Sequence, residues 1–236
     1  MKSKYFRIIL GGFIICFVTL IGLNLHSSEA LSVQSYVWRD DFNESALNPR
    51  WYWQNEDPAY WSLAENPGTL LIRTKTGYTP MYLLQDIPVG NFEIETYLDF
   101  TPVENFQGAG LTVYLDNNNI LALIRAYCDQ AWCSGNAIYF DHVENGEFIG
   151  SSYGTVVPNL SIIWLKLLRE GSDYTAYYSE NGTDWTMLGE HTIGFQPGSI
   201  GLDVHNSGSG PEIPAKFDYF NLVDNSKFIY LPLIIK

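Results

Sequence analysis

Short runs in which apolar and polar residues alternate recur along most of the chain. In NFEIETYLDF, residues 91–100, alternate positions form one apolar face and one face that is rich in acids. A period of two is that of a β-strand with one buried and one solvated face. Helical periodicity is nearly absent beyond the first thirty residues. Eight other runs also predict strands: TLLIRT, AGLTVYL, ILALIRAY, AIYFDHV, IIWLKLLRE, YTAYYS, SIGLDVH and KFDYFNL.

The connections between these runs carry residues that are typical of tight turns. Asn145-Gly146 and Asn181-Gly182 are dipeptides that accept the positive φ angles of a two-residue hairpin. Residues 116–119 form a polar turn between two of the runs. Strands at this spacing, with no helices between them, predict an antiparallel β-sandwich. We expect one such domain over residues 31–223.

The start of the chain departs from this pattern. Three basic residues precede an uncharged apolar run over residues 8–25, and Ser28-Glu29-Ala30 has the small-x-small form of a cleavage site. This arrangement predicts a secretory signal peptide over residues 1–30, with a retained membrane anchor as the alternative. A cleaved signal would make the protein secreted, either extracellular or on the cell surface, and without an integral membrane segment.

The end of the chain, residues 224–236, is the second departure. Its last nine residues, FIYLPLIIK, are almost wholly apolar. An apolar run of this kind predicts a last strand or arm that packs on the domain. The alternative is an anchoring or sorting signal, through which the chain would contact a cell surface or a protein partner.

Charge and cysteine content narrow the range of partners and cofactors. The formal net charge of −13 argues against nucleic acid and anionic membranes as partners, and it leaves carboxylates free for a hard cation such as Ca²⁺. Cys128 and Cys133 lie close together in CDQAWC, and an isolated pair of this kind in an exported protein predicts a disulfide. Neither zinc binding nor cysteine catalysis has the further ligands or thiols it would need.

Five segments, taken in order, resemble the concanavalin A-like lectin/glucanase jelly roll. The resemblance is closest to the sandwich domain attached C-terminally to family-43 glycoside hydrolases, the beta-xylosidase C-terminal-like domain, and it spans residues 40–222. It implies an all-β, two-sheet antiparallel jelly roll with a concave front that often binds carbohydrate. Some relatives are glucanases or lyases, and others carry a calcium ion where the first and last strands meet. The segments are DDFNESALNPRWYW, YWSLAENPGTLLIRT, FQGAGLTVYLDNNNILALIR, YYSENGTDWTMLGE and GSIGLDVHNSGSGPEIPAKFDYFNL.

Catalytic patterns are weak in this sequence. Glucanases of the family that the chain resembles place acids on one strand as E-x-D-x-x-E, where they flank the scissile bond. Glu93, Glu95 and Asp99 share a face here, but their spacing is E-x-E-x-x-x-D. The histidines beyond residue 30 lie in separate segments, and no G-x-S-x-G sequence is present. We therefore expect no catalytic residues, with a polysaccharide hydrolase or lyase that uses these acids as the alternative.

Carbohydrate binding is the function that the side chains favour. Aromatic rings cover the apolar face of a sugar, and acids, amides and arginine bond its hydroxyl groups. Alternation places several tyrosines on the polar faces of their strands, and Trp132 falls at the tip of the predicted disulfide loop. The alternative is that these rings pack the sandwich. The candidate ligand-binding residues are Glu95, Tyr97, Tyr114, Arg125, Trp132, Tyr139 and Asp141.

A calcium site is the candidate metal centre. The resemblance implies that Asp218, together with Asp40 or Asp41, meets at the seam between the first and last strands. Arg39 or Lys216 would neutralise these acids if no cation did. The sequence as a whole predicts a secreted, non-catalytic domain that binds a polysaccharide or other glycan on its concave sheet. A cell-surface structural or adhesive domain is the third alternative.

Overall fold

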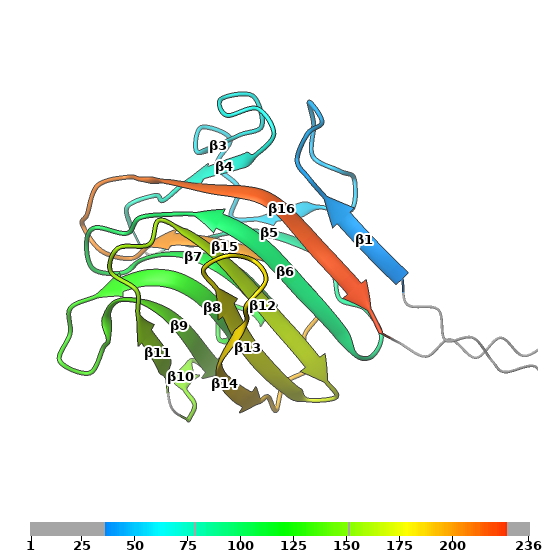
Figure 1. Ribbon diagram of the computed structural model, residues 1–236, viewed down its shortest axis with the longest axis vertical. Coiled ribbons are helices and arrows are strands. Elements are labelled where there is room, and N and C mark those ends of the chain that lie inside the picture. Colours follow the sequence, from blue (N-terminus) through cyan, green and yellow to red (C-terminus); the bar gives the residue numbers. More distant parts are fainter. Residues whose placement is uncertain (1–35, 78, 151, 226–236) are drawn as a thin grey trace, which may run out of the picture. The chain divides into compact units, whose positions relative to one another are not determined.

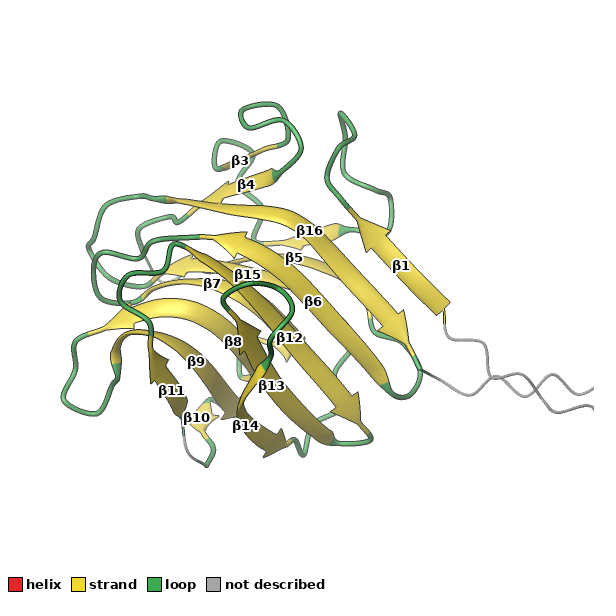
Figure 2. Cartoon of the chain, in the orientation of Figure 1, coloured by secondary structure: helices red, strands yellow, loops and turns green. Residues whose placement is uncertain are grey.

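The computed structural model describes residues 36–77, 79–150 and 152–225. The expected signal peptide over residues 1–30 and the tail beyond residue 225 lie outside these residues. Sixteen β-strands and no helix are found in the described part, and Figure 2 shows only strands and loops there. All paired strands run antiparallel, so the predicted all-β sandwich is confirmed.

Eight strands form the first sheet, which we call sheet A. Its order is β14-β13-β12-β6-β16-β4-β3, and β1 pairs with β16 beside this path (Figure 1). The first and last described strands are therefore neighbours, with Asp40 opposite Phe220. The bounds are β1 Tyr36–Asp40, β3 Trp61–Ser62, β4 Leu70–Arg73, β6 Phe92–Asp99, β12 Ile162–Glu170, β13 Asp173–Ser179, β14 Thr186–Thr192 and β16 Pro214–Asp224.

The other eight strands form sheet B. Its order is β10-β9-β8-β7-β15-β5-β2, and β11 pairs with β9. The central strands β7, β8 and β9 are ten residues long, which gives this sheet a broad outer face. The bounds are β2 Tyr52–Gln54, β5 Met81–Asp86, β7 Gln107–Asp116, β8 Asn119–Cys128, β9 Gly135–Glu144, β10 Glu147–Phe148, β11 Tyr153–Val156 and β15 Ser199–Asn206.

The hydrophobic core lies between the two sheets and follows the alternation of the sequence. In β6, Phe92, Ile94 and Leu98 are fully buried, while the acids between them are only partly buried. Leu111 of β7 and Leu123 of β8 contribute to the core from sheet B. Each fully buried side chain of this size contributes about 1.5–3 kcal/mol through removal of apolar surface from water. The core positions leave every other side chain of β7, β8, β9 and β15 on the outer face of sheet B.

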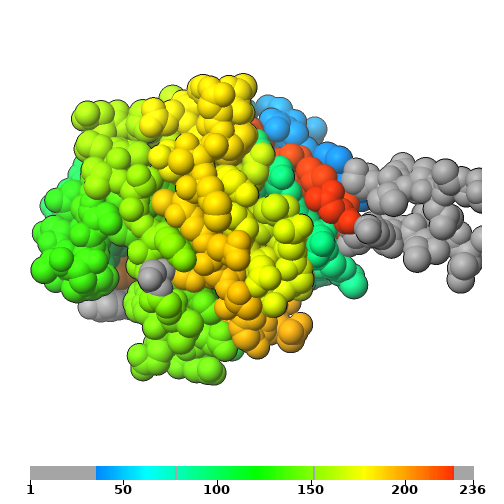
Figure 3. Space-filling model, turned by 60° about the horizontal axis from the view of Figure 1, so that its bottom comes forward, coloured from blue at the N-terminus to red at the C-terminus, as the bar shows by residue number. Residues whose placement is uncertain are grey.

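At one edge of the sandwich, β14 of sheet A packs against β9 and β11 of sheet B (Figure 3, orange against green). The ring of His191 in β14 lies 4.7 Å from that of Phe140 in β9 and 5.1 Å from that of Tyr153 in β11, between centroids. A Cβ at Gly189 would lie 2.3 Å from the Tyr153 ring, so only glycine allows this approach. The two sheets are therefore closed along this edge.

Candidate functional site

A pocket of about 770 Å³ lies on the outer face of sheet B. Strands β8, β9 and β15 supply its floor, and the loops after β8 and β10 supply much of its wall. This hollowed face is the candidate site, because a cavity of this size can enclose a small ligand such as a sugar unit.

Apolar side chains that are unusually exposed line the rim of the pocket. The Trp132 side chain is 72% exposed and that of Phe148 is 67% exposed, and Phe106 and Ile149 are also exposed. A group of large apolar side chains in solvent around one opening marks a contact surface, because it is costly to hydrate without a partner.

The disulfide between Cys128 and Cys133 forms part of the pocket wall. It joins the last residue of β8 to the loop before β9, so it confirms the pairing that the sequence predicts. Trp132 lies in the short loop that this disulfide closes. The crosslink therefore restricts the backbone that carries the most exposed ring of the rim.

Tyr139 contributes a fixed ring to the pocket. Its hydroxyl donates to the carbonyl oxygen of Gly135 at 2.7 Å and accepts from the backbone N–H of Ser134 at 3.1 Å. Both bonds tie the side chain to the disulfide loop. Burial raises the pKa of Tyr139, so the hydroxyl stays protonated at neutral pH.

Asp141, His142 and His205 are ionisable residues that line the pocket, and Asp203 contacts His205. Ser152 donates a hydrogen bond to Oδ1 of Asp141, and burial raises the pKa of this carboxyl despite that bond and the nearby charge of His205. Nδ1 of His205 lies 3.1 Å from Oδ1 of Asp203. Burial alone would lower the pKa of His205, but the charge of Asp203, the hydrogen bond to it and the charge of Asp141 together raise it.

The floor beneath His205 is bare backbone. A Cβ at Gly108 of β7 would lie 2.4 Å from Nε2 of His205 and 3.2 Å from Cδ1 of Ile124. Glycine at this position therefore allows the imidazole to lie flat across β7 towards β8. The small side chain of Ala126 also lines the floor, which keeps the pocket open.

The structure brings together three of the seven residues that the sequence predicts for ligand binding. Trp132, Tyr139 and Asp141 all line the pocket. Tyr114 lies on the same outer face of sheet B but packs against Tyr82, with ring centroids 4.8 Å apart, and is not part of the pocket lining.

The prediction was wrong for Glu95 and Tyr97 as members of this site. Both lie in β6 of sheet A, on the opposite outer face of the sandwich from Tyr139 and Asp141. Alternation fixes which side chains share a face of one strand, but it does not say to which sheet the strand belongs.

The prediction was also wrong for Arg125, which is fully buried and lies on the core side of β8. Its guanidinium donates to carbonyl oxygens of Ala137 at 3.0 Å and Val157 at 3.1 Å, among others. Burial lowers the pKa of Arg125 to about 10, which leaves it charged at neutral pH. It ties β8 and β9 to the segment after β11 and does not face a ligand.

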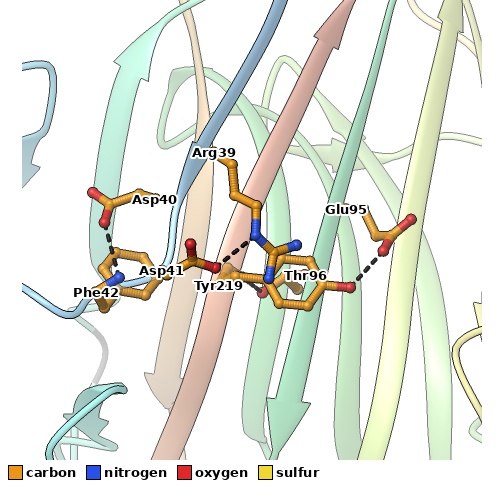
Figure 4. Close-up of polar contacts among 7 residues, drawn as sticks. All are labelled: Arg39, Asp40, Asp41, Phe42, Glu95, Thr96 and Tyr219. Carbon is orange, nitrogen blue, oxygen red and sulfur yellow. Dashed lines mark hydrogen bonds and ion pairs between the residues drawn. The ribbon is translucent and has the colours of Figure 1, made fainter.

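The acids considered for catalysis are paired with lysines on the outer face of sheet A. Nζ of Lys166 lies 3.2 Å from carboxylate oxygens of both Glu93 and Glu95, and Nζ of Lys216 lies 3.2 Å from Asp99. Figure 4 shows that Glu95 also accepts from the hydroxyl of Tyr219. Two lysines thus partly compensate the charge of the three acids.

The seam acids serve the closure of the fold. Asp40 accepts a hydrogen bond from the backbone N–H of Phe42 at 2.9 Å, and Asp41 pairs with Arg39 at 2.6 Å (Figure 4). Asp40 also accepts a hydrogen bond from the indole N–H of Trp51 at 2.8 Å. Asp218 is exposed at a bulge in β16, between residues that pair with β6. Within the described residues no group of three or more His, Cys, Asp or Glu side chains is arranged to hold a metal ion. Asp40 and Asp41 are thus engaged in hydrogen bonds and an ion pair, and the calcium site stays a prediction.

His205 and Ser152 are pocket residues that the sequence prediction missed, together with Asp203, which pairs with His205. Asp203 and His205 are two residues apart in SIGLDVH, so alternation does place them on one face, and this signal could have found them. The histidines are also less scattered than the sequence indicates, because the rings of His142 and His191 lie 5.4 Å apart.

Comparison with known proteins agrees with this fold. A protein of Escherichia coli (strain K12), provisionally named a beta-xylosidase, is 26% identical over 202 residues, which are 78% of this chain and 38% of that protein. The GH43 BlXynB protein of Bacillus licheniformis superposes with a TM-score of 0.68 at 23% identity, covering 79% of this chain and 39% of that one. For xylan beta-1,4-xylosidase from Bacillus halodurans C-125 the TM-score is 0.67 at 21% identity, covering 85% and 41%.

The chain spans only 38% to 41% of the length of these relatives. No helix in the described part of the chain is long and apolar enough to cross a membrane. Residues 39–222 match the family model described as Beta xylosidase C-terminal Concanavalin A-like domain. Because this match covers most of the chain, the protein belongs to the family of beta xylosidase C-terminal concanavalin A-like domains.

Proposed function

We propose that this protein is a secreted, non-catalytic carbohydrate-binding domain whose sheet B pocket holds a sugar unit of a glycan. The observation that carries the proposal is the exposed ring of Trp132 at the rim of a pocket that also contains Tyr139 and Asp141. Aromatic faces cover the C–H face of a sugar ring, and a carboxylate accepts hydrogen bonds from its hydroxyls. All three side chains reach one cavity of sugar size.

The names of the relatives indicate which glycans to test first. They include a xylan beta-1,4-xylosidase and a non-reducing end alpha-L-arabinofuranosidase of Bacteroides ovatus. Polysaccharides that contain xylose or arabinose are therefore the first candidates. These activities belong to the relatives, of which the present chain covers less than half.

The test is binding to a glycan array, followed by calorimetry with the best oligosaccharides. Trp132→Ala is expected to weaken binding at least about tenfold, because removal of an aromatic anchor that a ligand covers costs about 2 kcal/mol or more. Trp185→Ala is the matched control, since this indole lies over Lys166 on sheet A. The absence of binding to any glycan, or an equal loss in both variants, would contradict the proposal.

The enzymatic alternative is tested on the same panel by release of reducing sugar. Lysine pairing of Glu93, Glu95 and Asp99 favours no release. Release that is lost in Glu95→Gln would establish a hydrolase or lyase instead. Export is supported by the disulfide, which persists in oxidising compartments, and detection of the protein in the culture medium would test it.

A further inference from the structure

Asp141 is the carboxylate that lines the pocket, and the two histidines of the lining, His142 and His205, are each paired with a further carboxylate. This distribution of charge determines the kind of sugar that the pocket can accept. We propose that the pocket selects an uncharged sugar unit and rejects acidic sugars such as uronic acids. This inference rests on the proposed carbohydrate binding, and it adds the chemical class of the ligand.

Asp141 supplies a negative charge directly at the pocket surface. Ser152 donates to Oδ1, and Oδ2 accepts no hydrogen bond from any of the described residues. An oxygen in this state is an acceptor for a ligand hydroxyl group. For the carboxylate of a uronic acid it is a like charge in a partly desolvated site, which disfavours binding.

A protonated His205 or His142 could offset an acidic ligand, but each is already paired, with Asp203 and Glu144 respectively. His205 lies at the floor. Its Nδ1 lies 3.1 Å from Asp203, whose carboxylate is almost fully buried. The pair carries no net charge when His205 is protonated and a negative charge when it is neutral. In both states the ionised carboxyl of Asp141 adds a further negative charge.

No lysine or arginine is found among the described residues that line the pocket. Arg125 lies in the neighbouring strand β8, but its side chain points into the core and donates to backbone carbonyl oxygens. Recognition of a carboxylate usually requires an arginine or lysine placed against it. The pocket therefore lacks the groups that would bind a uronic acid, and it has the acceptors and rings that bind hydroxyl groups and C–H faces.

The test compares neutral and acidic oligosaccharides of equal length. The probes are xylo-, arabino- and gluco-oligosaccharides, together with xylo-oligosaccharides that carry glucuronic acid and oligogalacturonates. We expect the neutral member of each pair to bind at least about tenfold more tightly. The preference is expected to persist at about 0.5 M salt, because salt screens the net charge of the whole chain more strongly than a charge inside a pocket.

Two variants assign the preference to the pocket. Asp141→Asn is expected to reduce the ratio of neutral to acidic affinity at least about threefold, because it removes the carboxylate at the pocket surface. Asp99→Asn removes the same charge on sheet A, where it pairs with Lys216, and is expected to leave the ratio unchanged.

The outcomes separate this inference from the function on which it rests. Binding of neutral and acidic probes with equal affinity, or tighter binding of the acidic ones, would overturn the selectivity alone. An equal effect of Asp99→Asn and Asp141→Asn would also overturn it, because the preference would then come from overall charge. If no probe binds to the wild-type protein, the carbohydrate function fails and the selectivity with it.

Discussion

The floor of the pocket depends on glycine at position 108, which leaves room for the ring of His205. Gly108→Ala would place a Cβ 2.4 Å from Nε2 of His205, which Asp203 holds in position. We expect the variant to lose about 1–3 kcal/mol of unfolding free energy through overpacking and to weaken sugar binding, because the imidazole must move into the pocket. Urea denaturation and calorimetry measure the two effects.

Gly198→Ala provides the control, since a Cβ there would meet nothing within 4 Å. Equal losses in the two alanine variants would show that the effect is one of backbone freedom and not of the contact with His205.

Individual residues also show how far the sequence predicts the site. Asp141, Tyr139 and Trp132 were predictable from alternation and from the cysteine spacing. The burial of Arg125 was not predictable, because a charged residue near the end of an apolar run is ordinarily exposed. Here four backbone carbonyl oxygens accept hydrogen bonds from the guanidinium and offset its burial, and only the folded chain brings them together.

At the scale of the element, the disulfide loop carries the rim of the pocket. Replacing both Cys128 and Cys133 with Ser is expected to cost about 2 kcal/mol of stability, the entropy of a loop this short. The double serine variant should also bind sugar more weakly than a variant with a mutation outside the loop, because Trp132 would sample more conformations. Thermal denaturation and calorimetry, each with Trp132→Ala alongside, would measure both effects.

If Trp132 acts through the constrained loop, the double serine variant and Trp132→Ala should not have additive effects on binding. Full additivity would instead mean that the disulfide stabilises the fold without positioning the ring.

The nine runs predicted as strands all occur as strands, and IIWLKLLRE corresponds to β12 without any shift. The prediction did not include β5, MYLLQD, whose first five residues are all buried. Its inner face lies in the core, and its outer residue Tyr82 is covered by Tyr114. A strand that is buried on both faces has no polar alternation to reveal it.

At the scale of the whole molecule, the sequence predicted two sheets but could not assign strands to them. The acids of β6 and the tyrosine and acid of β9 have the same alternating character. Only the long-range pairing, β6 with β12 and β16, and β9 with β8, places them on opposite sides of the sandwich. The family resemblance fixes the fold class but does not by itself supply this register.

The seam between the first and last strands tests how the sandwich is closed. Asp40 caps the turn at Phe42, which has a positive φ of 52°, and holds the indole of Trp51, whose ring packs 5.0 Å from that of Phe220 in β16. We therefore expect Asp40→Ala to lower stability by about 1–3 kcal/mol, because two donors lose their acceptor. Removal of calcium with EDTA should leave the melting temperature unchanged, since both oxygens of Asp40 already accept hydrogen bonds and Arg39 pairs with Asp41.

Thermal melts of the wild type, Asp40→Ala and Asp218→Ala, each with EDTA and with added calcium, decide between hydrogen bonding and metal binding at the seam. A bound ion would stabilise the folded state by mass action, so the melting temperature would rise with calcium concentration and Asp218→Ala would abolish the rise. That result would contradict closure by hydrogen bonds alone. A loss of stability in Asp40→Ala that is the same with and without calcium would instead show that the seam is held by the contacts of Asp40 with Phe42 and Trp51.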